Sequence, residues 1–145
     1  MKLPRTLLMA LLYLPFTLLA QDNTLDYIGI GDAYIRELPP SVKNTAVYMS
    51  ITNDSEAAIR IVGVSSELAE SAMLHRTAME NNMMTMQHVM FLEIAAGQTL
   101  LLEPGALHIM LTGLKTSLRA GDSVPLILEF DNGLNLALNV PVVSL

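Results

Sequence analysis

The chain has 145 residues, a length that fits one domain with enough chain to bury a core. It carries eight basic and fourteen acidic residues, and this acidic balance argues against nucleic acid or an anionic membrane surface as a partner. It contains no cysteine, which excludes blue-copper electron transfer, iron–sulfur clusters and cysteine-rich zinc sites. An exported protein with a sufficient core does not need disulfides, so the lack of cysteine is compatible with export.

The N-terminus has the pattern of a secretory signal peptide, which we assign to residues 1–20. Lys2 and Arg5 precede an apolar run from Leu7 to Leu19, and Ala20 is a small residue at a cleavage point. The run is too short for a membrane span and no basic stop-transfer cluster follows it. We therefore expect an exported protein, with no stable membrane insertion after signal cleavage. An uncleaved N-terminal anchor is the alternative.

The predicted mature domain, residues 21–145, keeps six basic and fourteen acidic residues, a formal net charge of −8. It consists of short apolar runs separated by turn residues and lacks long stretches of helical periodicity. The segments with the alternation or the β-branched and aromatic content of strands are 27–30, 33–36, 45–52, 59–65, 72–78, 83–89, 99–103, 107–112, 124–130 and 134–143. We expect a break at Gly31-Asp32 and one short helical turn at Ser66–Glu70. Regular short strands with turns between them predict an all-β sandwich or barrel.

All three histidines and six of the ten methionines lie between His75 and Met110. Within this stretch His75, Met86, His108 and Met110 follow the spacing His-x10-Met-x21-His-x-Met. Two imidazoles and two thioethers form a neutral, soft ligand set that suits Cu(I) and discriminates against magnesium, calcium and zinc. These four residues are the candidate metal site.

Strand geometry provides a way for the four side chains to meet. His108 and Met110 are two residues apart on a predicted strand, so they point to the same face. If Met79–Asn82 forms a four-residue hairpin loop, His75 faces Met86 across an antiparallel pair, with Cβ atoms about 4.5–5.5 Å apart. Docking of the His108 strand beside this hairpin would then close a four-ligand site.

Methionine also commonly fills gaps in hydrophobic cores, and we interpret some of the methionines in this way. The methionines that we assign to the core are Met49, Met73 and Met90. Three others lie in or beside the predicted loop and either line the mouth of the site or shield it: Met79, Met83 and Met84. His88 shares the face of Met86 but falls outside the predicted pairing, so a surface or structural histidine is the simpler interpretation, with metal contact as the alternative.

The spacing of the four residues resembles the signature of the PCuAC-type periplasmic copper chaperones. The flanking segments that look like family segments are 46–53, 64–69, 102–114 and 118–122, and the similarity covers about residues 27 to 142. The resemblance implies a cupredoxin-like Greek-key β-barrel or sandwich that binds one Cu(I) per chain at His75, Met86, His108 and Met110. It also implies a protein that is not an enzyme and that hands copper to the CuA centre of cytochrome c oxidase subunit II, directly or with a thiol-bearing assembly factor.

Two features depart from the family pattern, and three other functions stay open. Thr77 stands where members often carry a methionine, although this position is not one of the four ligands. The sequence ends after Val142 without a His- and Met-rich tail, so we do not expect a second copper site of that kind. The alternatives are copper buffering or tolerance, a metal-free β-sandwich interaction module, and a histidine-brace copper enzyme. Gln21 at the predicted mature N-terminus argues against the enzyme, which needs histidine there.

Overall fold

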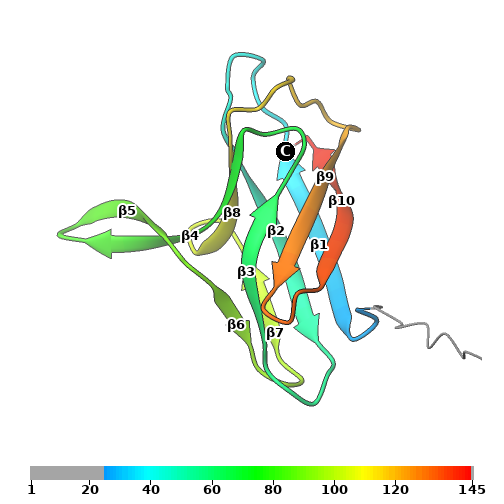
Figure 1. The fold of residues 1–145 in the computed structure, drawn as a ribbon. Coiled ribbons are helices and arrows are strands. Elements are labelled where there is room, and N and C mark those ends of the chain that lie inside the picture. Colours follow the sequence, from blue (N-terminus) through cyan, green and yellow to red (C-terminus); the bar gives the residue numbers. More distant parts are fainter. Residues whose placement is uncertain (1–24, 145) are drawn as a thin grey trace, which may run out of the picture.

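The structure is a computed structural model that describes residues 25–144, and in it a ten-stranded sheet folds into two layers around one core (Figure 1). The strands are β1 (Ile28–Arg36), β2 (Thr45–Asn53), β3 (Ile59–Ser65), β4 (Ser71–Glu80), β5 (Met83–His88), β6 (Leu92–Ile94), β7 (Thr99–Leu102), β8 (Leu107–Thr112), β9 (Ser123–Phe130) and β10 (Asn135–Val143). The part of the chain that is described contains no helix, so the predicted all-β class is confirmed. The predicted signal peptide, residues 1–20, lies outside the described residues.

The two layers differ in which strands they contain and meet at a single seam. One layer has the order β5-β4-β8-β2-β1, with β7 on the same edge of β2 as β8. The other has the order β10-β9-β3-β6. At the seam β1 runs parallel to β10, with Ile35 opposite Val142, whereas the other strand pairs recorded between residues 25 and 144 are antiparallel. Between these residues, no helix has the length and hydropathy that a bilayer crossing requires.

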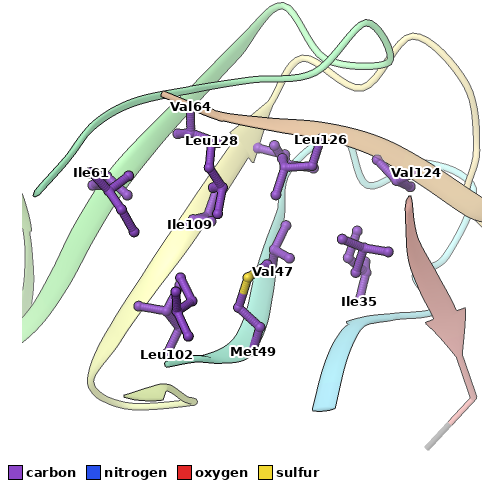
Figure 2. Close-up of a cluster of buried hydrophobic side chains, with 14 of the residues drawn as sticks. Ile35, Val47, Met49, Ile61, Val64, Leu102, Ile109, Val124, Leu126 and Leu128 are labelled. Carbon is purple, nitrogen blue, oxygen red and sulfur yellow. The ribbon is translucent and has the colours of Figure 1, made fainter. Parts of the chain in front are cut away.

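The core is aliphatic and is filled from both layers. Side chains that meet there include Ile35, Val47, Ile109, Val64, Leu126 and Leu128 (Figure 2). Because side chains alternate along a strand, the complete burial of Ile109 and Leu111 in β8 turns His108 and Met110 to the opposite face. Core packing of β8 therefore fixes where two of the predicted ligands point.

Two local predictions need correction. β1 continues through the expected break at Gly31-Asp32 as one strand with a bulge, and Asp32 adopts a φ of 49°, a conformation that aspartate tolerates better than most residues. The helical turn expected at Ser66–Glu70 is wrong, because this segment forms non-helical turns. The Ser66 hydroxyl donates to the Pro125 carbonyl at 2.6 Å, and such side-chain bonds compete with helix formation.

β4 and β5 form a hairpin arm that extends away from the rest of the molecule (Figure 1). Its turn is made by two residues, Asn81 and Asn82, whose φ values of 51° and 61° match the type I′ turn of tight hairpins. The predicted four-residue loop, and with it the predicted pairing of His75 with Met86, is therefore wrong by two residues. A shift of two residues leaves every side chain on its own face, so Met86 still shares the face of His75.

Candidate metal centre

The three histidines form one row across β5, β4 and β8. His75 lies opposite His88 on one side and opposite His108 on the other. The ring centroids of His75 and His108 are 5.8 Å apart with an interplanar angle of 81°, and those of His75 and His88 are 6.1 Å apart at 72°. The tight turn thus brings His88 into the row, where the sequence reading had not placed it.

Methionines flank this row on both sides. Met110 is the next residue of β8 on the same face and lies opposite Met73. On β5, Met86 lies opposite Thr77, one step along the arm from the row of histidines. The four predicted ligands therefore share one face of the sheet, with Met86 as a diagonal rather than a direct neighbour of His75.

A hollow of about 310 Å³ opens on this face. Its lining includes Met84, Met86, His108 and Met110, together with Arg36, Leu38, Tyr48 and Thr77. None of the described residues that line it is acidic, so it offers neutral nitrogen and sulfur donors and no carboxylate for a hard cation. His75 does not line the hollow, but its ring lies edge-on beside that of His108.

Two imidazole nitrogens on this face are buried without a hydrogen-bond partner, Nε2 of His108 and Nδ1 of His75. Nδ1 of His108 lies 3.1 Å from the carbonyl oxygen of Ala106. Since a carbonyl can only accept, Nδ1 carries the proton and Nε2 presents a free lone pair. Leaving a buried polar atom unpaired costs about 1–3 kcal/mol. Metal coordination would satisfy such a nitrogen, and a backbone carbonyl on the second ring nitrogen is the usual support for a ligating histidine.

A metal site on this face needs the methionine sulfurs. Across residues 25–144, no group of three His, Asp or Glu side chains is placed so that it could hold a metal ion. The row of histidines offers two unpaired buried nitrogens, and the same face also carries the thioethers of Met86 and Met110. The arrangement therefore suits a soft monovalent cation better than a divalent ion of the calcium or zinc type.

Two titratable side chains on this face, His75 and Tyr48, have pKa values shifted in the direction that favours their uncharged forms. Burial lowers the pKa of His75 below its usual value, and the adjacent His108 and His88 rings lower it further. Burial raises the pKa of Tyr48, an effect that Arg36 partly opposes and Tyr34 adds to, so the phenol beside the hollow keeps its proton. A monovalent cation bound here would carry the only charge in its immediate ligand shell.

We expect the imidazole of His75 to titrate below pH 6.5 in the metal-free protein, as followed by NMR of the ring protons. The unfolded chain then takes up this proton at a higher pH than the folded chain, so folding stability falls as the pH drops through about 6.5. The variant His75→Gln removes this contribution and should flatten the pH dependence of the free energy of unfolding in urea. A His75 pKa at or above 6.5 would contradict the partial burial of its side chain.

The methionines assigned from sequence divide between core and surface. Met49 is 2% exposed and lies in the core, as predicted. Met73 and Met90 are 40% and 81% exposed, so their assignment to the core is wrong. The three expected in or beside the loop are exposed: Met79, Met83 and Met84.

The sequence profile of the family described as "Putative lipoprotein LpqE-like" matches residues 28–142. The chain belongs to this family. The LpqE-like chain is 33% identical over 131 residues to "Putative lipoprotein Lxx21020" of Leifsonia xyli subsp. xyli, a match that covers 90% of this chain and 78% of that protein. It is 28% identical over 104 residues to "Uncharacterized protein RP573" of Rickettsia prowazekii, covering 71% of this chain and 58% of that protein.

Solved structures similar to the LpqE-like chain include copper-bound proteins. The Cu(I) form of DR1885 from Deinococcus radiodurans is 36% identical, with a TM-score of 0.67 and coverage of 86% of this chain and 83% of that one. The copper-bound PCuAC domain from PmoF2 has a TM-score of 0.69 at 17% identity, a likeness of fold that covers 82% of this chain and 94% of that one. The resemblance to PCuAC-type proteins and the cupredoxin-like fold that it implied are confirmed.

Proposed function

We propose that this LpqE-like protein is a periplasmic copper carrier that binds one Cu(I) per chain at His75, Met86, His108 and Met110. The observation that carries the proposal is the pair of unpaired, buried imidazole nitrogens on a sheet face that also bears thioethers. The 36% identity to Cu(I)-bound DR1885 supports copper as the cargo. The acceptor that we propose is the CuA centre of cytochrome c oxidase subunit II, reached directly or through a thiol-bearing assembly factor.

The four ligands differ in how deeply they are buried, which suits a carrier that must both hold and release its metal. His108 is 3% exposed, and the hydrogen bond from its Nδ1 to the Ala106 carbonyl leaves the lone pair on Nε2. It is therefore the ligand that is held most firmly in place. Met86 is 59% exposed on the projecting arm, within reach of another protein. We infer that release begins there, when a softer thiolate of the acceptor replaces the Met86 thioether on Cu(I). This exchange moves ligands and no electrons.

The proposed role is carriage rather than catalysis. Two nitrogens and two sulfurs complete a four-coordinate shell, and catalytic metal sites instead keep one position open for water or substrate. The acidic composition also argues against a nucleic-acid partner. Export follows from the signal-like residues 1–20, and cell fractionation of the tagged protein should place it in the periplasm.

Copper transfer tests the proposal. The Cu(I)-loaded protein is mixed without oxygen with the metal-free soluble fragment of oxidase subunit II, the two are separated, and copper is measured in each. Most of the copper should move to the fragment, because its thiolates bind Cu(I) more strongly than thioethers do. Copper that stays on the loaded protein would contradict delivery and favour buffering or tolerance, whereas failure to load at all would favour a metal-free interaction module.

A further inference from the structure

A second group of soft side chains lies beside the proposed site and is not used by it. His88 ends β5, opposite His75. A backbone hydrogen bond of 2.8 Å from Val89 N to Leu74 O continues the pairing one residue further. In that register Met90 lies opposite Met73, which is two residues before His75 and on the same face of β4.

These three side chains line a hollow of their own. It has a volume of about 330 Å³ and lies where the β4 edge faces β3. Its lining includes Met73, His88 and Met90, with Glu129 and apolar residues completing the wall. The Glu129 carboxylate lies over Gly63, where a Cβ would come within 2.5 Å of its Oε2, so the absence of a side chain at position 63 makes room for this acid.

Packing does not account for the thioethers in this hollow. Met90 is 81% exposed and Met73 is 40% exposed, so neither contributes much to the core. Both methionines expose a sulfur donor beside His88, the histidine of the row that is not part of the proposed site. The hollow therefore offers a nitrogen and two sulfurs, with a carboxylate in its wall to balance a single positive charge.

We propose that Met73, His88 and Met90 form an outer Cu(I) position next to the inner site, with His75 between the two. The proposal rests on the proposed function, because it presumes that the inner site holds Cu(I). The ring of His75 is nearly equidistant from those of His108 and His88, at 5.8 Å and 6.1 Å. Copper passes between the positions by exchanging thioether and imidazole ligands, with no change of oxidation state. Three neutral ligands in an open hollow bind more weakly than four, so the outer position fills second.

The test is a titration of the exported protein with Ag(I), a monovalent soft probe, followed by NMR of ¹³C-labelled methionine methyl groups. The first equivalent should shift the methyl signals of Met86 and Met110. The second should shift those of Met73 and Met90. In the variant Met73→Leu/His88→Gln/Met90→Leu, the stoichiometry should fall from two to one and the first phase should remain.

Met83→Leu is the matched control, because Met83 is 65% exposed and lies on the opposite face of the arm. This variant should still bind two equivalents of Ag(I). A second equivalent that is absent, or that shifts the Met79 and Met84 methyls instead, would overturn the outer position alone. If the first equivalent of Ag(I) leaves the Met86 and Met110 methyl signals unshifted, both the proposed function and this inference are overturned. Because each methyl signal is resolved, failure of the inner site can be told from failure of the outer position.

Discussion

The double variant His108→Ala/Met110→Ala should bind Cu(I) at least about 100-fold more weakly than the unmodified protein, a loss of about 2.8 kcal/mol or more. It removes one nitrogen and one sulfur from four proposed ligands. The nitrogen is the Nε2 atom that the Ala106 hydrogen bond leaves unprotonated and that has no other partner. Competition with a Cu(I) chelator of known affinity measures the change.

A matched control separates ligand loss from a general effect of removing side chains. Met83→Ala removes a methionine that is 65% exposed on the face of the arm opposite His75, and should change Cu(I) affinity by no more than about twofold. Urea unfolding of both metal-free variants checks that the sheet still forms. Unchanged Cu(I) affinity in a folded double variant would remove His108 and Met110 from the site.

Truncation of Ile109 should give the largest loss of stability among single changes near the site. Ile109 is fully buried and packs in the core beside Val47 and Leu128, while its chain neighbours on β8 carry the proposed ligands (Figure 2). Ile109→Ala should lower the free energy of unfolding by about 2–5 kcal/mol through lost burial and the cavity left behind. Equilibrium unfolding in urea measures it.

Ile127→Ala is the control for this change, because Ile127 is 37% exposed on β9 and should lose clearly less stability. The folded Ile109→Ala protein should still bind Cu(I), since the deleted atoms lie on the core side of β8 and the ligands on the other. A stability loss below about 1 kcal/mol would mean that β8 is not held by the core as the structure indicates.

Most strands could be predicted because each has its own local signal. In β2 buried residues alternate along the whole strand, the period of two that the sequence shows. The predicted strands 124–130 and 134–143, which flank Asp131-Asn132-Gly133, pair with each other as β9 and β10. β6 was missed because three residues are too few to show a period, and it is defined by its pairing with β3.

At the site, the faces could be predicted but the register could not. Alternation along β4, β5 and β8 is a local property, so His75, Met86, His108 and Met110 were assigned to one face from the sequence. Which residues lie opposite one another depends on turn length, and the Asn81-Asn82 pair was read as part of a longer loop. Reading it as a type I′ turn would have placed His88 opposite His75.

The exposure of Met73 and Met90 could not be read from their own sequence context. Met73 lies opposite Met110 on the sheet face turned away from the core, and Met90 lies between β5 and β6, outside the strands. The exposure of both therefore depends on how the strands are placed in the fold. In the same way, residue spacing indicates only a soft metal ion. Copper and its delivery enter through the resemblance to PCuAC-type proteins.

X-ray absorption at the copper edge, on protein loaded with one equivalent of Cu(I), tests the proposed coordination most directly. We expect two sulfur and two nitrogen scatterers, from Met86, Met110, His75 and His108. A shell of nitrogen and oxygen without sulfur, or protein that retains no copper after loading, would contradict a site built from thioethers and imidazoles.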